Sequence, residues 1–144
     1  MESWHPLIVH FPLVLLPLSV GVDLLALWRK RPQWQELAYG LLGLGAVASA
    51  LAVLSGNSAA DLYRKNPQVQ GFVAAHEDWA TLTLLLFLGL ALSRLPLQLQ
   101  GQLQGGRFKI WLAVAVAGCA LLWLTGYTGG EMVYLYGVGI KINH

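Results

Sequence analysis

Charged residues and cysteine are both scarce in this sequence, and each scarcity narrows what the protein can be. Only 11% of its 144 residues are charged, whereas 56% are hydrophobic. A soluble domain has roughly 25% charged residues, and a chain of this length could not bury so much apolar surface in water. The single cysteine, Cys119, cannot form an intrachain disulfide. The small net charge of +2 gives no reason to expect nucleic-acid binding.

Several familiar cofactor and catalytic motifs are also missing. The sequence has no CxxCH motif, which excludes covalent attachment of a c-type haem. It contains neither the H-E-x-x-H motif of zinc proteases nor a glycine-rich phosphate loop. No internal sequence repeat stands out. We therefore expect an electron carrier or a sensor rather than an enzyme in its own right.

Long apolar segments dominate the chain instead. Four of them reach the length of about 20 residues that a helix needs to cross a bilayer. They cover residues 6–28, 37–56, 74–95 and 108–127. Small residues recur along the second segment, which predicts close packing of that helix on a neighbour. We expect an all-α fold, a single integral membrane domain over residues 1–144, built as an antiparallel bundle of four transmembrane helices.

The distribution of Lys and Arg predicts the orientation of this bundle. Residues 29–36 and 96–107, counted with the adjoining span ends, hold six basic residues: Arg29, Lys30, Arg31, Arg94, Arg107 and Lys109. The other side holds three: Arg64, Lys65 and Lys141. By the positive-inside rule the first side is cytoplasmic. Both termini should then face the periplasm of a bacterial inner membrane that the protein crosses several times.

The four histidines all fall on the predicted periplasmic side. His10 lies about four residues inside the first span, and His76 opens the third. An ionisable residue within a membrane span is by default a candidate for function. A face of His10, Val14, Pro17 and Gly21 and a face of His76, Ala80, Thr83 and Phe87 recur at helical spacing. If the two faces oppose each other, a planar cofactor could lie between the two histidines.

Other polar residues have simpler interpretations. His5 stands beside Pro6 at the expected helix start, where it could hydrogen-bond to water or a carbonyl, and His144 at the chain end is expected to be solvated. We expect Asp23 to form a salt bridge with the basic cluster at residues 29–31. Glu131 follows two glycines that could end a helix, or it could orient a histidine N–H.

These residues predict a haem site, and two alternative functions are considered beside it. His10 and His76 would be the axial ligands, Gly129 and Gly130 would leave room for the ring edge, and Arg64 would pair with a propionate. The first alternative is a zinc or copper site made by His5, His10, His76 and a carboxylate. The second is a non-catalytic assembly subunit, in which the histidines only tie helix ends together.

Several segments resemble a known family. The stretch "HPLIVHFPLVLLPLSVGVDLLA", the "AHE" at residues 75–77 and the "TGYTGGEMVYLYGVGI" at residues 125–140 resemble recurring blocks of the bacterial membrane family called domain of unknown function 2231. The resemblance implies a four-span membrane domain, in some proteins fused to cytochrome c-type modules. It also implies that His5, His10, His76 and Glu131 occupy motif positions, without indicating what they bind.

We therefore expect a membrane protein that binds haem b on its periplasmic side. It would transfer electrons, or sense a redox state or a gaseous ligand. The expected partners are the lipid bilayer, a periplasmic cytochrome or another redox protein, and a second copy of the chain as a homodimer.

Overall fold

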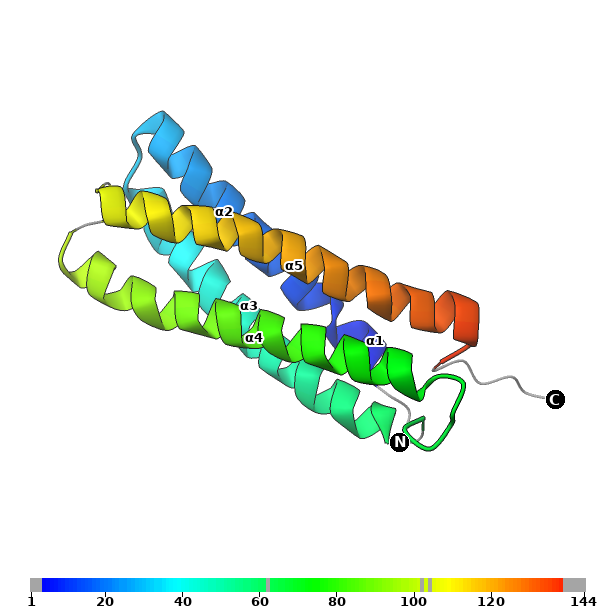
Figure 1. Ribbon diagram of the computed structural model, residues 1–144. Helices are drawn as coiled ribbons and strands as arrows, with labels where there is room; N and C mark the ends of the chain where they lie inside the picture. Colours follow the sequence, from blue (N-terminus) through cyan, green and yellow to red (C-terminus); the bar gives the residue numbers. More distant parts are fainter. Residues whose placement is uncertain (1–3, 62, 102, 104, 139–144) are drawn as a thin grey trace.

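The computed structural model is a bundle of long helices (Figure 1). It describes all residues except 1–3, 62, 102, 104 and 139–144. The helices are α1 (His5–Ile8), α2 (His10–Arg29), α3 (Gln33–Ala60), α4 (Gln70–Leu99) and α5 (Gly106–Tyr136). The described part of the chain contains no strand. The expected all-α fold is confirmed.

Four membrane-spanning helices are also confirmed by length and composition. The candidate spans are His5–Arg29, Gln33–Ala60, Gln70–Leu99 and Gly106–Tyr136. Each is longer than its predicted apolar segment, and the last continues nine residues past the predicted end at 127. Its 31 residues make a rod of about 46 Å at 1.5 Å per residue, against a hydrocarbon core of roughly 30 Å. Hydropathy identifies only the part of each helix that lies in lipid. The helix ends that project from the bilayer were therefore not predicted.

The first span is interrupted near its beginning. The break between α1 and α2 falls at Val9. Pro12 explains it, because its ring removes one N–H and crowds the carbonyl four residues earlier, that of Ile8. Pro17 lies inside the uninterrupted helix α2. α2 ends at Lys30, whose left-handed backbone (φ 52°) lets its N–H donate to the carbonyls of Ala26 and Leu27.

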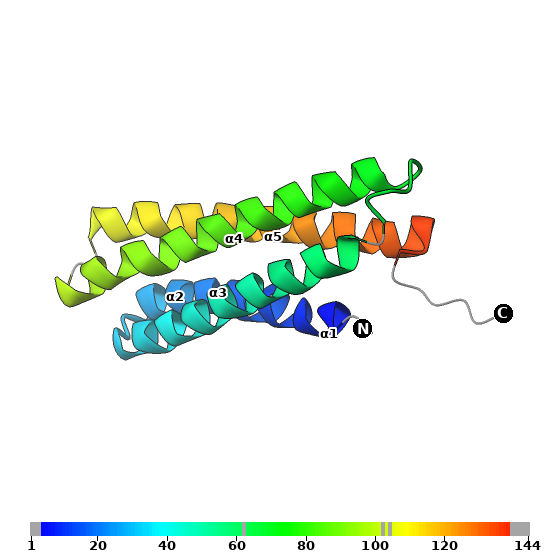
Figure 2. The same cartoon turned by 90° about the horizontal axis from the view of Figure 1, so that it is seen from below.

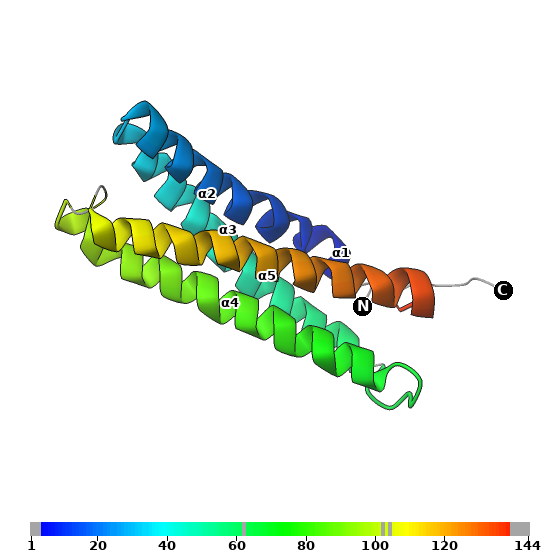
Figure 3. The ribbon, with the colours of Figure 1, turned by 45° about the horizontal axis from the view of Figure 1, so that its top comes forward.

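The helices pair as two antiparallel hairpins. α1 and α2 form the first hairpin with α3, and α4 forms the second with α5 (Figures 1 and 2). In the described structure α2 and α4 each pack against both α3 and α5, whereas α2 and α4 lie diagonally opposite and meet through side chains, as in the pair of Asp23 and Arg94. Trp4, Val138 and the α3–α4 turn lie at one end of the bundle, which we call the histidine end. The α2–α3 and α4–α5 turns lie at the other, the basic end (Figure 3).

The two hairpins bury equivalent positions, which we interpret as an internal duplication. In α2 the buried residues are Pro12, Leu16, Ser19, Val20, Asp23 and Ala26. All but Ala26 have a buried counterpart 71 positions later in α4: Thr83, Phe87, Leu90, Ala91 and Arg94. Of the eight buried α3 residues, all but Ala46 and Ala60 have a buried counterpart 73 positions later in α5. These pairs join Gln35, Ala38, Leu42, Gly45, Ser49 and Ala52 with Phe108, Trp111, Ala115, Gly118, Leu122 and Thr125.

Contacts repeat along with burial. Leu16 packs so closely on Gly45 that a Cβ there would lie 2.5 Å from Leu16 Cδ2, and Phe87 packs on Gly118 in the same manner, at 3.1 Å. Asp23 and Arg94 are counterparts of each other and form an ion pair. Two equivalent residues can meet only across a symmetry axis. The hairpins are therefore related by a pseudo-twofold axis parallel to the helices, which the dissimilar side chains conceal in the sequence.

Candidate cofactor site

A cavity of about 450 Å³ lies at the histidine end, with walls from all the helices. His5, His10 and His76 line it, together with the glycines Gly56, Gly126, Gly129 and Gly130. Its other walls are mostly apolar. Thr83 and Thr125 form a polar floor, with their hydroxyl oxygens 2.9 Å apart. One helical turn deeper, Leu16 and Phe87 are fully buried and close the bundle.

His76 is held in place by the neighbouring helix. Its Nδ1 lies 3.1 Å from Thr128 Oγ1, and the Thr128 hydroxyl also lies within hydrogen-bonding distance of the Thr125 carbonyl, at 3.0 Å. The Nδ1 side of the ring is therefore bonded to α5. Gly129 lets the ring lie against α5, since a Cβ there would lie 3.0 Å from His76 Cε1.

His5 is held in the same way in the other half. Its Nδ1 lies 3.1 Å from Ser55 Oγ, and Ser55 donates its own proton to the Ala52 carbonyl at 3.0 Å. A Cβ on Gly56 would lie 2.9 Å from His5 Cε1. The imidazoles of His5 and His76 line the same cavity. The cavity thus receives one hydroxyl-anchored, glycine-backed imidazole from each hairpin.

His10 differs from these two histidines. It lines the cavity but is exposed, and its Nδ1 donates to the Pro6 carbonyl of its own segment at 2.6 Å. The expected inward face through Val14 and Gly21 is wrong, because both residues are exposed and α2 turns Pro12 and Leu16 inward instead. On α4 the expected face is confirmed: His76, Ala80 and Thr83 line the cavity, and Phe87 is buried below them.

Arg64 and Glu77 form an ion pair at the rim of the cavity. Arg64 Nη2 donates to Glu77 Oε1 at 2.6 Å, and Asp61 lies 3.5 Å from the same guanidinium. Glu77 lines the cavity. The hydrogen bond and charge of Glu77, with a smaller contribution from Asp61, raise the pKa of Arg64, which stays cationic. Arg64 is therefore placed at the rim with a carboxylate already bound.

Glu131 does not orient a histidine in the described structure. It accepts a hydrogen bond from Tyr127 at 2.9 Å, along its own helix. The hydroxyls that do orient histidines belong to Ser55 and Thr128, which sequence reasoning missed. One signal could have identified them: each directly precedes a glycine that packs on the same ring. Gly129 and Gly130 line the cavity as expected, but they lie inside α5, which ends at Gly137.

A conventional metal cage is not formed. Among the described residues, no three His, Cys, Asp or Glu side chains are grouped so that they could hold one metal ion. His144, which the sequence places on the same side, lies outside the described residues. The arrangement provides three imidazoles that line a mostly apolar space, rather than the three or four converging protein ligands typical of zinc.

The polar cluster toward the basic end is of another kind. Asp23 pairs with Arg94, and not with the predicted cluster at residues 29–31. Arg94 Nη2 also donates to the Gln35 carbonyl at 2.9 Å, and the guanidinium lies 4.9 Å from the ring centroid of Trp111. Arg94, which was counted among the basic residues at the predicted cytoplasmic side, is fully buried. Without it, the count of basic residues behind the predicted orientation is five against three.

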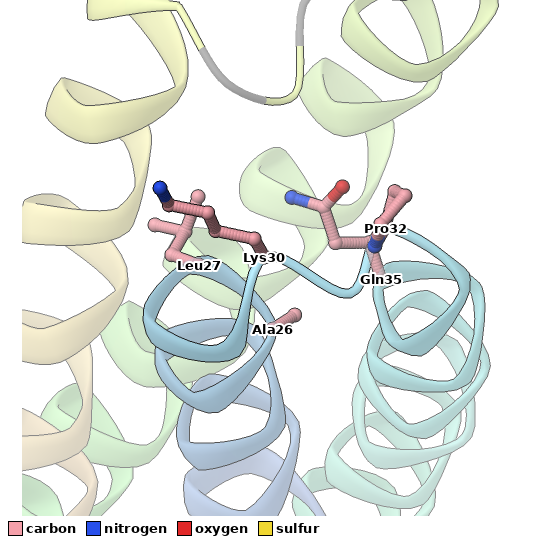
Figure 4. Close-up of a pocket in the computed structure, with 5 residues that line it drawn as sticks. All are labelled: Ala26, Leu27, Lys30, Pro32 and Gln35. Atoms are coloured by element: carbon pink, nitrogen blue, oxygen red, sulfur yellow. The ribbon is translucent and has the colours of Figure 1, made fainter.

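A smaller cavity of about 250 Å³ lies beside the α2–α3 turn. Figure 4 shows Lys30 and Gln35 extending above this turn, with Leu27 beside Lys30 and Ala26 below. The Gln35 amide donates to the Leu103 carbonyl at 2.9 Å, which ties the turn to the α4–α5 connection. The cavity is therefore part of the packing between two turns.

The comparison with known families agrees with this architecture. The profile of a family described as "Predicted membrane protein (DUF2231)" matches residues 2–142. No curated protein and no solved structure matches the chain. The protein belongs to the DUF2231 family of predicted membrane proteins.

Proposed function

We propose that this membrane protein binds haem b in the cavity at the histidine end and uses it for electron transfer or for sensing a redox state or a gaseous ligand. One observation carries the proposal. Imidazoles anchored through Nδ1 line the same apolar cavity from different helices. A hydrogen bond from the second ring nitrogen is the usual support of a metal-binding histidine.

The size and polarity of the cavity favour haem over a bare metal ion. Its volume of about 450 Å³ falls within the roughly 300–1,000 Å³ typical of cofactor sites. A haem iron already has four porphyrin nitrogens and needs only one or two imidazoles from the protein. The mostly apolar walls suit a porphyrin, whereas an isolated ion would need further ligands.

Arg64 can support a haem propionate at the rim. Its side chain is half exposed and already contacts the carboxylates of Glu77 and, at a longer distance, Asp61. A guanidinium presents several donors in one plane, so a propionate could take the place of the more distant Asp61. Asn57 adds an amide to the same wall of the cavity. The propionates would then point toward the water at the histidine end.

The membrane setting defines the partners of such a protein. By the positive-inside rule the histidine end faces the periplasm of a bacterial inner membrane. A haem near that surface would exchange electrons with a periplasmic cytochrome or a similar redox protein. Large apolar side chains such as Leu85 and Ile110 are exposed on the bundle, where they would contact lipid or a second copy in a homodimer.

Spectroscopy and elemental analysis of the purified protein test this function together. The protein should be expressed in haem-replete cells and purified in detergent. We expect a Soret band, a reduced-minus-oxidised α band typical of haem b, and iron without stoichiometric zinc or copper. If the purified protein contains zinc or copper but no haem, the cavity is a metal-ion site and not a haem site. A folded protein with no haem and no metal would contradict the proposal.

A further inference from the structure

We propose that the haem lies on the pseudo-twofold axis and is ligated on its two faces by His5 and His76, one from each hairpin. This inference rests on the proposed function and specifies its ligands. It differs from the pair predicted by the sequence, His10 and His76.

The supports of His5 and His76 match atom for atom. Each Nδ1 lies 3.1 Å from a hydroxyl, that of Ser55 or Thr128, and each hydroxyl donates to a carbonyl three residues earlier. His76 lies 71 positions after His5, and Thr128 lies 73 positions after Ser55. These are the same offsets that relate the buried faces of the two hairpins. The two histidines are therefore equivalent under the duplication.

His10 has no such equivalent. The residue 71 positions later is Thr81, which is exposed. The bond from His10 to the Pro6 carbonyl stays within its own segment, so no other helix holds the ring in place. His10 lies beside the cavity entrance, where its loss would leave both anchored imidazoles in place.

The symmetry also indicates how the two histidines would hold the haem. His5 and His76 come from opposite hairpins and line the same cavity. A haem bound between the hairpins could therefore take one imidazole from each.

Two protein ligands leave the iron no open position. A six-coordinate haem passes electrons but does not bind a gas unless a ligand leaves. Of the two activities proposed above, ligation by His5 and His76 therefore selects electron transfer over gas sensing. A haem with one histidine ligand would have an open position and would favour gas sensing instead.

The test compares three single variants of the full chain in detergent: His5→Ala, His76→Ala and His10→Ala. Electron paramagnetic resonance of the ferric form and carbon monoxide binding to the ferrous form are the readouts. We expect a low-spin wild type that does not bind carbon monoxide. His5→Ala and His76→Ala should each become high-spin and bind carbon monoxide, and added imidazole should restore the low-spin signal. His10→Ala should match the wild type.

Contrary outcomes separate the two levels of the proposal. A haem-loaded wild type that is high-spin, or a high-spin His10→Ala beside a low-spin His5→Ala, would overturn the ligand pair but keep haem binding. Absence of haem from the wild type would overturn both. If a histidine-to-alanine variant fails to fold, His5→Met and His76→Met replace it, because methionine can also ligate haem iron. These variants should show an altered low-spin spectrum.

Discussion

The polar groups in the two ends of this bundle are used differently. In the cluster of Asp23 and Arg94, both carboxylate oxygens and two guanidinium nitrogens are hydrogen-bonded within the protein. At the histidine end, the Nδ1 atoms of His5 and His76 are hydrogen-bonded, and the two rings line a cavity. A cluster whose hydrogen bonds are made inside the protein stabilises the fold. A cluster that is anchored on one side and open on the other is suited to a ligand.

Removing one charge from the buried pair should have the largest effect on stability. Arg94→Ala leaves Asp23 as an uncompensated buried charge, which costs about 3–5 kcal/mol. Thermal unfolding in detergent measures the loss. The exposed Arg29→Ala is the matched control and should leave the unfolding temperature nearly unchanged. Replacing both partners, as Asp23→Leu with Arg94→Leu, should cost less than either single change. An Arg94→Ala protein as stable as the control would show that the pair does not stabilise the fold.

A smaller loss of stability is expected when Gly45 or Gly118 is replaced by alanine, because a large side chain packs on each of these glycines. Gly45→Ala places a Cβ 2.5 Å from fully buried Leu16, and Gly118→Ala places one 3.1 Å from Phe87. Overpacking of this kind costs typically about 1–3 kcal/mol, with Gly45→Ala the more severe. Gly43→Ala, which meets nothing within 4 Å, is the control. Unfolding temperatures that rank the three variants in another order would contradict the described packing.

Loss of the hydroxyl anchors should weaken the site without weakening the fold. Thr128→Val and Ser55→Ala remove the groups that hold His76 and His5. Losing such a support typically lowers metal affinity about 10–100-fold. Haem titration of the two variants should give similar losses, because the anchors are equivalent in the two hairpins. The control is Ser58→Ala, which removes an exposed hydroxyl that bonds only to its own helix. A large loss for one anchor and none for the other would break the equivalence.

The smallest effect is expected at the rim. The ion pair of Arg64 with Glu77 is exposed on the arginine side, and exposed pairs contribute about 0–1 kcal/mol. Arg64→Ala should therefore leave the unfolding temperature of the apoprotein almost unchanged. If Arg64 holds a propionate, the same variant should lower haem affinity more than stability, whereas Lys65→Ala should change neither. An unchanged affinity would remove Arg64 from the site.

The sequence was sufficient to predict the four helices but not their inward faces. Long apolar runs predict spans because each must cross a bilayer. On a helix that faces lipid, however, apolar residues lie on every side, so their periodicity does not indicate what is buried. That is why Val14 was expected to face inward and is exposed, and why the burial of Arg94 was missed.

The candidate site was partly predictable for a related reason. Polar residues in an apolar chain are conspicuous, so all three described histidines were identified together with Gly129 and Gly130. Their partners depend on which helices meet. Ser55 and Thr128 acquire a role only when α1 packs on α3 and α4 packs on α5. The duplication was also hidden, because the equivalent positions share burial rather than residue type, as Asp23 and Arg94 show.

The most direct test of the central claim is a titration of purified, haem-free protein with haem. It compares the wild type with a variant that carries both His5→Ala and His76→Ala. We expect the wild type to bind one haem per chain saturably and to show a low-spin spectrum. The double variant should lose that spectrum, while its unfolding temperature without haem stays near that of the wild type. A wild type that binds no haem, or a double variant that binds it with the same spectrum and affinity, would contradict the account.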